Sequence, residues 1–161
     1  MTSLLDTPLL YVQDYGPLLR DALKRGVSIQ ILVMDPSTEN GDVLSLHIDA
    51  SNRGGRLEQL RQRINQTISS VNSLRAEGIQ AQYKGSIEIR TLRGLMLHSM
   101  WIRDGSLSDG NPLAHLGYYW HRGSEYAPSL RVSGKTSPKL VENAKQEFAA
   151  MWTAASPVPS K

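Results

Sequence analysis

The sequence contains no cysteine. This absence excludes a disulfide-stapled scaffold, a thiolate metal site and a cysteine nucleophile, and it fits a reducing compartment. No uninterrupted apolar run approaches the roughly 20 residues that a membrane-spanning helix needs. Asp6 precedes every basic residue near the N-terminus, which does not match a secretory signal. We therefore expect a cytoplasmic protein without a membrane span.

An internal repeat is also absent, since no pattern recurs at a period of about 20–50 residues. The chain has 161 residues, of which 40% are hydrophobic and 20% are charged, so it can bury a core. This length fits one domain. We predict a single α/β domain over residues 1–154 and a disordered tail over residues 155–161, where Pro157 and Pro159 follow the last helix pattern.

Positive charge is concentrated in the middle of the chain. Residues 53–93 contain eight Lys and Arg but only three Glu, which gives this segment a net charge of +5 and leaves −2 for the rest. Such a segment attracts phosphate, nucleic acid or an acidic partner. More often it is a solvated helix face, with arginine stems lying over apolar surface. The candidate basic patch comprises Arg53, Arg56, Arg61 and Arg63.

The first regular elements are a helix and a buried strand. We predict a helix over Asp14–Arg25, with Asp14 as its N-cap, Pro17 in its first turn and Gly26 as its end. Val27–Met34 is nearly continuously apolar, which is typical of a central strand covered on both faces.

A long helix follows a polar segment. Residues 37–55 are rich in turn formers, with a short helix available over residues 43–48. The pattern over Arg56–Glu77 predicts a helix that ends at Gly78. Arginines flank its apolar seam and would repel each other in a parallel homodimeric coiled coil, so we expect the helix to lie on a sheet.

After Gly85 the hydrophobic period changes to two, which predicts strands separated by turns. Ser137 and Pro138 then mark the start of a closing helix. A strand over Leu4–Val12 would be interrupted by Pro8, so we expect it to be short, displaced or missing. The four later strands are Ser86–Thr91, Leu95–Arg103, His115–His121 and Ser129–Val132.

These elements predict a mixed α/β fold, in which a mostly central sheet is flanked by helices. The strand over Val27–Met34 lies within the sheet beside the later strands. The helix over Arg56–Glu77 makes the right-handed crossover between them.

Three segments resemble the phospholipase D-like superfamily, over roughly Tyr11 to Thr153. Leu18–Pro36 (LLRDALKRGVSIQILVMDP) is similar to the helix and first full strand of a phospholipase D-like half-domain. Leu97–Leu107 (LHSMWIRDGSL) occupies the place of the catalytic strand, and Glu147–Trp152 (EFAAMW) resembles the final helix, whose Phe and Trp dock on the sheet. The resemblance implies a phospholipase D-like α/β half-domain.

The catalytic pattern of that family is broken in this chain. Active members carry His-x-Lys followed by an Asp five residues after the Lys. Here His98 is followed by Met100 at the lysine position and by Gly105 at the aspartate position. Sliding the motif to use Asp104 places Leu97 and Ser99 at the His and Lys positions. The resemblance therefore implies a degenerate member, similar to catalytically silent domains of bacterial regulatory and defence proteins.

Binding is accordingly the function we expect. The leading hypothesis is a ligand-sensing or interaction module, homodimeric like related half-domains, which binds a phosphorylated small molecule, a nucleotide or a partner protein. One alternative is a divergent homodimeric phosphodiesterase or nuclease that uses His98. Another is a nucleic-acid-binding protein that uses the basic region Arg53–Arg93. We expect no cofactor.

The four histidines do not predict a metal site. No two of His47, His98, His115 and His121 have the two- or four-residue spacing of a metal-binding pair. His98 as a nucleophile needs a cation beside the phosphate. Strand alternation puts Arg103 on the opposite face, so a strand histidine with a structural role is the simpler interpretation.

The remaining candidates lie in three segments. Tyr118–Arg122 is dense in aromatics and can stack a base beside Arg122, or it forms core and interface packing. Asp35 and Ser37 follow the buried strand, where open α/β sheets bind ligands, and also make an ordinary turn. Lys135, in a Gly-Lys-Thr segment without the upstream glycine of a P-loop, precedes the last helix and can meet an anion there. The ligand-binding candidates are His98, Tyr119, His121, Arg122, Asp35, Ser37 and Lys135.

Overall fold

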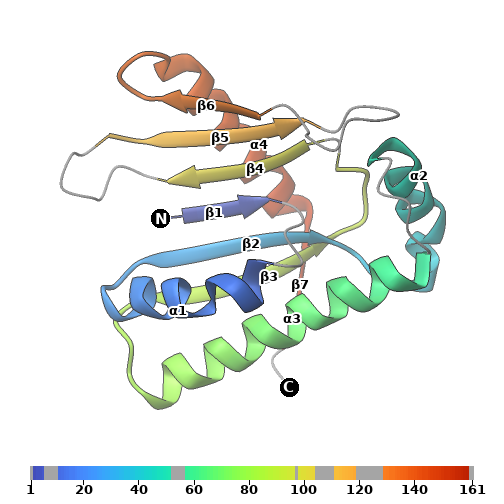
Figure 1. The fold of residues 1–161 in the computed structure, drawn as a ribbon, viewed down its shortest axis with the longest axis horizontal. Coiled ribbons are helices and arrows are strands. Elements are labelled where there is room, and N and C mark those ends of the chain that lie inside the picture. Colours follow the sequence, from blue (N-terminus) through green and yellow to red (C-terminus); the bar gives the residue numbers. More distant parts are fainter. Residues whose placement is uncertain are drawn as a thin grey trace.

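The computed structural model describes residues 2–5, 11–51, 57–96, 98–103, 111–118 and 129–159. Over these residues the chain forms a seven-stranded sheet in the order β6-β5-β4-β1-β2-β3-β7, with helices against both faces (Figure 1). The predicted mixed α/β class is confirmed. The strands are β1 (Thr2–Leu5), β2 (Ser28–Met34), β3 (Ser86–Leu92), β4 (His98–Arg103), β5 (Leu113–Tyr118), β6 (Ser129–Ser133) and β7 (Ser156–Pro157). The helices are α1 (Tyr11–Lys24), the 3-10 helix η1 (Thr38–Asn40), α2 (Gly41–Ser51), α3 (Leu57–Gln80) and α4 (Pro138–Ala154).

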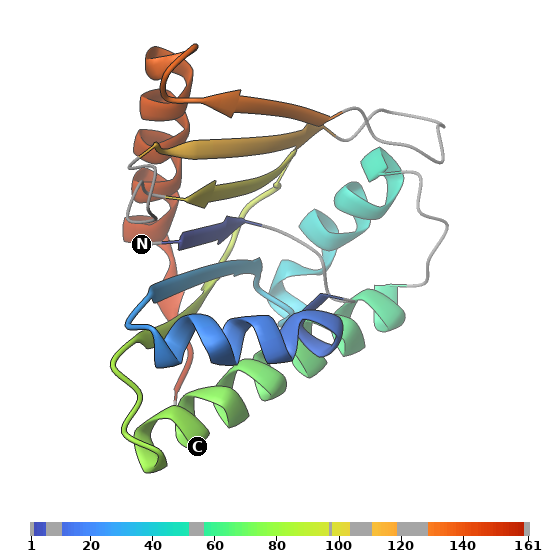
Figure 2. The same ribbon diagram turned by 60° about the vertical axis from the view of Figure 1, so that its left-hand side comes forward.

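The three strands β1, β2 and β3 form the parallel half of the sheet. Leu4 of β1 pairs with Ile31 of β2, and Ile31 pairs with Ile89 of β3. Consecutive residues of β2 face opposite sides, and both Ile31 and Leu32 are buried, Leu32 completely. α1 and α3 cover one side of this half, while α4 crosses the other side (Figure 2). The prediction of a central strand covered on both faces is therefore confirmed.

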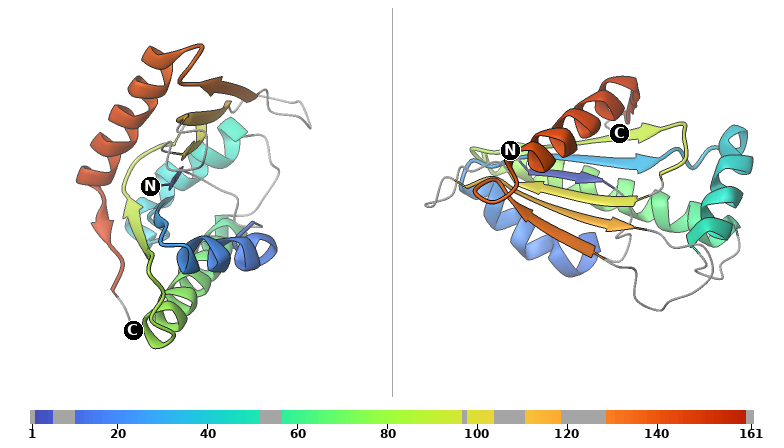
Figure 3. Two further views of the ribbon diagram at one scale, coloured as in Figure 1. Left: turned by 90° about the vertical axis from the view of Figure 1, so that its left-hand side faces the viewer. Right: turned by 90° about the horizontal axis from the view of Figure 1, so that it is seen from above.

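The three strands β4, β5 and β6 form the antiparallel half. β4 runs back beside β1, and β5 and β6 continue the meander. α4 packs on one face, where Met100 and Ala114 are buried. On the opposite face Trp101 is 52% exposed, and His115 and Arg131 are also exposed. Figure 3 (left) shows α4 on one side of the sheet and α1 and α3 on the other, beside the parallel half.

The opening strand is short, as expected, and lies at the centre of the sheet. β1 has only four residues, and it separates β2 from β4. β1 therefore joins the two halves of the sheet, because it is parallel to β2 and antiparallel to β4.

α1 differs from its prediction at the start and agrees at the end. It begins at Tyr11, so Asp14 is not its N-cap and Pro17 lies inside the helix instead of in its first turn. A proline in that position withholds one backbone hydrogen bond, which packing of the helix must offset. The helix ends before Gly26, whose φ of +88° is the left-handed conformation that glycine adopts readily.

α3 lies on the sheet, as predicted, but it does not end at Gly78. The helix continues to Gln80, and the chain then turns through Gln82 at a φ of +54°. A Cβ at Gly78 would lie 3.4 Å from the ring of Tyr83, so this glycine lets the returning chain approach the helix closely. Ile64 and Val71 of the predicted apolar seam are buried.

The segment before α3 is more helical than predicted. η1 and α2 together occupy all of residues 38–51, whereas we expected a polar segment with a helix over residues 43–48 only. Leu44 is fully buried, which explains why the whole helix forms against α3 and not just its apolar part.

None of the helices in the described part of the chain has the length and apolar character that a membrane span requires.

Three features of the last third differ from their predictions. β5 begins two residues earlier than predicted, and the end of the predicted strand, residues 119–121, is outside the described residues. Ser137 precedes α4 as predicted, but its side chain makes no capping hydrogen bond. Residues 155–159 are not a disordered tail. They add the edge strand β7 to β3, where Pro157 is tolerated because an edge position needs fewer backbone donors.

Candidate functional site

The ends of several strands come together at one edge of the sheet. β1, β2 and β3 finish there, and the antiparallel register places the starts of β4 and β6 and the end of β5 at the same edge. α2 lies beyond this edge (Figure 3, right). Ligands of open α/β sheets bind outside the carboxyl ends of their strands. We call this region the carboxyl edge.

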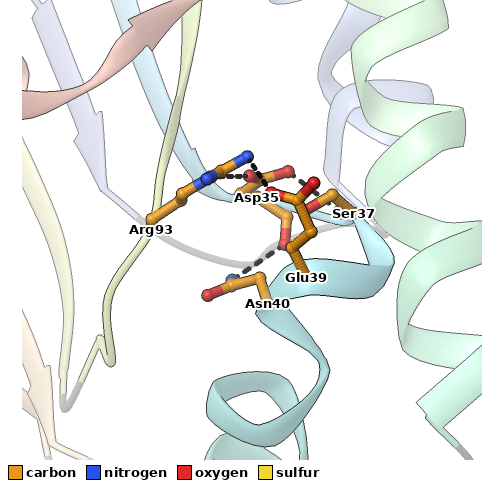
Figure 4. Close-up of polar contacts among 5 residues, drawn as sticks. All are labelled: Asp35, Ser37, Glu39, Asn40 and Arg93. Carbon is orange, nitrogen blue, oxygen red and sulfur yellow. Dashed lines mark hydrogen bonds and ion pairs between the residues drawn. The ribbon is translucent and has the colours of Figure 1, made fainter.

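The ends of β2 and β3 are joined by an ion-pair cluster. The backbone N–H of Asp35 donates to the carbonyl of Leu92 over 2.9 Å, which aligns the two strand ends. Arg93 follows β3 directly, and its Nε donates to Oδ2 of Asp35 over 2.9 Å (Figure 4). Its Nη2 lies 2.8 Å from the carboxylate of Glu39 in η1. Arg93 therefore links β3 to both β2 and η1.

A turn after β2 completes this cluster. The backbone N–H of Ser37 donates to Oδ1 of Asp35 over 2.9 Å, as in an Asx turn. The side-chain amide of Asn40, which is buried, donates to the backbone carbonyl of Asp35 over 2.9 Å (Figure 4). The Ser37 hydroxyl oxygen is buried beside the Asp35 carboxyl without hydrogen-bond geometry.

Asp35 is ionised at neutral pH. Burial alone raises the pKa of this carboxyl, but donation by the Ser37 backbone N–H and the Arg93 guanidinium brings that pKa below its ordinary value. Both carboxylate oxygens already accept hydrogen bonds. Such a group does not suit general acid or base catalysis near neutrality.

Arg61 of α3 brings a second cation to the carboxyl edge. Its side chain is only 18% exposed, and a Cβ added at Gly41, the first residue of α2, would lie 3.0 Å from its Nη2. Its Nε is buried without a hydrogen-bond partner among the described residues. Within the same residues, the carboxylate that forms an ion pair with it is that of Glu58, at 3.9 Å and itself 82% exposed. The described carboxylates therefore neutralise the positive charge of Arg61 only weakly.

His47 has a structural contact that the sequence did not reveal. It lies on α2, is almost completely buried, and places its Nδ1 3.2 Å from the carbonyl oxygen of Met96. This contact fixes α2 against the segment that leads into β4. A histidine inside an apolar helical pattern was the available signal.

The structure brings some of the predicted candidates together. Asp35 and Ser37 are part of the carboxyl edge, and His98 enters the same edge as the first residue of β4, paired with Tyr118. β4 is two strands from β2, which corresponds to about 10 Å. Lys135 lies at the other edge, in the turn between β6 and α4, where its backbone N–H donates to Ser133. Tyr119, His121, Arg122, Arg53 and Arg56 are outside the described residues.

The basic segment 53–93 is not one surface. Arg63 is exposed on α3. Arg90 lies on the α4 side of the sheet, where its guanidinium stacks 4.5 Å from the ring of Trp152 and pairs with Glu88. Arg93 is held in the ion-pair cluster. Arg93 was counted in the segment but missed as a site residue, because its pairing with Asp35 depends on strand register.

No protein-family model matches this chain, and no curated protein matches it either. Among the residues that the structure describes, no three His, Asp or Glu gather as metal ligands do.

Proposed function

We propose that this protein is a non-catalytic, phospholipase D-like α/β module that binds a phosphate-bearing ligand at its carboxyl edge. The observation that supports the binding site is Arg61. A guanidinium that is mostly removed from water and weakly balanced is costly. An anion beside Arg61 would offset that cost and supply an acceptor for its unpaired Nε.

The hydrogen-bond donors around Arg61 favour a phosphate over an apolar ligand. Ser37 and Gly41 flank η1, whose rise of about 2 Å per residue keeps them within about 8 Å of each other. The buried Ser37 hydroxyl therefore lies in the same part of the carboxyl edge as Arg61, whose Nη2 approaches Gly41. Phosphate oxygens accept hydrogen bonds from hydroxyl and guanidinium groups.

Two strands are compatible with the proposed resemblance to phospholipase D-like half-domains. One strand precedes α1, at Thr2–Leu5, and residues 98–103 form the strand that the resemblance assigns to the catalytic position. Met100, at the position of the family's lysine, is buried against the α4 side of the sheet. A buried thioether there cannot hold a phosphate, which favours binding without catalysis.

Titration calorimetry with inorganic pyrophosphate tests the binding site. We expect Arg61→Gln to weaken binding about tenfold or more, because a charge-assisted hydrogen bond contributes about 1.5–3 kcal/mol. Arg63→Gln is the matched control, since Arg63 is exposed two positions further along α3. Equal weakening by both variants, or no binding by the wild type, would contradict the proposed site.

A phosphodiesterase assay tests the absence of catalysis. We expect no hydrolysis of a generic phosphodiester such as bis(p-nitrophenyl) phosphate. Hydrolysis that disappears in His98→Ala would instead support the divergent enzyme.

We further propose that the module is a homodimer, as the resemblance implies, with the two copies meeting near the His98 end of β4. Light scattering should then give twice the mass of the chain. A monomer at all concentrations would remove this part of the proposal.

A further inference from the structure

One face of the antiparallel half has no described helix on it. Figure 1 looks onto this face, with α1 and α3 in front of the parallel half only. We call it the open face. It carries a row of directly opposed residues, since Trp101 pairs with His115 and His115 pairs with Arg131. Opposed Cα atoms of antiparallel strands are about 4.5–5.5 Å apart, so the row spans about 10 Å.

The charge of the three strands has one sign. β4, β5 and β6 contain Arg103, Arg131 and two histidines but no Asp or Glu. Arg103 is engaged, since it donates to the carbonyl of Asn111. Arg131 is exposed and forms no ion pair with any residue in the described ranges. An occupant of the open face must therefore be anionic to be complementary.

The exposed indole of Trp101 limits which ligands fit the open face. Trp101 is large and apolar, and half of its surface is open to solvent at the middle of a sheet face. An isolated exposed apolar residue is ordinary, but here it lies in register with a histidine and an arginine. Sheet faces with exposed aromatics beside cations bind single-stranded nucleic acid, because bases stack on the rings and phosphates meet the cations.

Other occupants fit less well. A second copy would bring a second Arg131 to this face, and β4, β5 and β6 of neither copy carry an Asp or Glu to pair with it. A duplex keeps its bases stacked on each other and leaves Trp101 without a partner. An acidic peptide would satisfy Arg131 but would not use the indole.

We propose that the open face binds single-stranded nucleic acid, with a base stacked on Trp101 and a phosphate at Arg131. This site is separate from the carboxyl edge and does not depend on the pyrophosphate site proposed above. It also differs from the predicted basic patch, of which α3 carries Arg61 and Arg63.

Fluorescence anisotropy with labelled oligothymidylate and oligouridylate of about 12 nucleotides, a length within the site size of one single-strand-binding domain, tests the proposal. Trp101→Ala should weaken binding by about 5- to 150-fold, as expected for the loss of one stacked base. Arg131→Gln should weaken binding and reduce the slope of log affinity against log salt by about 0.7, the value for one phosphate contact on a single strand. A duplex of the same length should compete poorly.

Two control variants separate this site from the others. Leu140→Ala removes an apolar side chain of similar exposure from α4, and it should leave oligonucleotide binding unchanged. Arg61→Gln should also leave it unchanged, while Trp101→Ala should leave pyrophosphate binding unchanged. Because Trp101 is half exposed, its substitution should preserve the fold, which circular dichroism checks.

Four results would overturn the proposal. They are the absence of oligonucleotide binding by the wild type, binding that Trp101→Ala does not weaken, binding that Arg63→Gln weakens more than Arg131→Gln, and duplex binding as tight as single-strand binding. Loss of a dimer in Trp101→Ala without any oligonucleotide binding would show that a second copy covers this face.

Discussion

The parallel half and the antiparallel half of the sheet share α4 on one face but differ on the other. α1 and α3 cover the parallel half, whereas the antiparallel half leaves Trp101 and Arg131 exposed there. The sequences of the strands carry this difference. β2 is apolar at consecutive positions, as a strand buried on both faces must be. β4 alternates between buried Met100 and Ile102 and exposed Trp101.

The two halves also treat their charges differently. In the parallel half two arginines join different elements: Arg20 of α1 makes two hydrogen bonds to Glu77 of α3, and Arg93 contacts two carboxylates. In the antiparallel half, Arg131 has no such partner among the described residues. Ion pairs therefore hold helices and strand ends together in the parallel half, where Arg61 is the exception, whereas no described ion pair joins the strands of the antiparallel half.

The largest expected effect tests burial in the two halves directly. Leu32→Ala should lower the free energy of unfolding by about 2–5 kcal/mol, because Leu32 is fully buried between β2 and α4. Met100→Ala should give a similar loss, since this side chain is buried on the same face of the antiparallel half. Trp101→Ala should cost less than either, because about half of this side chain is already exposed. Urea unfolding measures all three, and a large loss in Trp101→Ala would show that the open face is covered.

The prediction of intermediate size concerns the contribution of the parallel half to folding stability at acid pH. The hydrogen bond from Arg20, followed by that from Tyr83, lowers the pKa of Glu77 from 4.5 to about 2. A carboxyl whose pKa is depressed by folding stabilises the fold above its unfolded pKa and loses that contribution as pH falls through its folded pKa. Wild-type stability should therefore fall between about pH 4.5 and pH 2.

Glu77→Gln should show a shallower fall over the same pH range, because the amide does not titrate. Denaturant unfolding at a series of pH values measures this slope. Glu142→Gln, on the exposed surface of α4, should keep the wild-type slope. Identical slopes for wild type and Glu77→Gln would contradict a role for the Arg20–Glu77 contact.

The smallest expected effect is local to the carboxyl edge. Arg93→Gln should raise the pKa of Asp35, since the carboxylate loses a charged donor while the Ser37 backbone N–H still donates. Carboxyl NMR titration measures the change. Arg90→Gln should leave the pKa of Asp35 unaltered, because Arg90 pairs with Glu88. If both variants shift it equally, general electrostatics explains the change better than the contact.

Local patterns predicted most of the elements. The continuous apolar run of β2 and the apolar seam of α3 correctly predicted which of their residues are buried. Each pattern can be recognised within one segment of the sequence. Boundaries were less accurate. Gly78 did not end α3, because the close approach of Tyr83 and packing on the sheet outweighed the poor helix propensity of glycine.

Part of the candidate site was also predictable. Asp35 and Ser37 were identified from their place after a buried strand. Arg93, which completes their cluster, was not, because its contact with Asp35 spans 58 residues of sequence and requires parallel pairing of β2 and β3. The sequence also did not show that the charge of Arg61 is only weakly neutralised, because in the sequence Arg61 looks no different from Arg63.

By itself, the sequence determined that this chain is cysteine-free, that helix, strand and helix patterns precede a run of strands and a closing helix, and which residues of each element are apolar. Only the tertiary structure decided that a four-residue strand joins the two halves, that residues 155–159 complete the sheet edge, and that Trp101 shares a face with Arg131. Periodicity is a local property of the chain. Strand order and register depend on contacts between distant segments, whose formation must overcome the entropy of closing the loops between them.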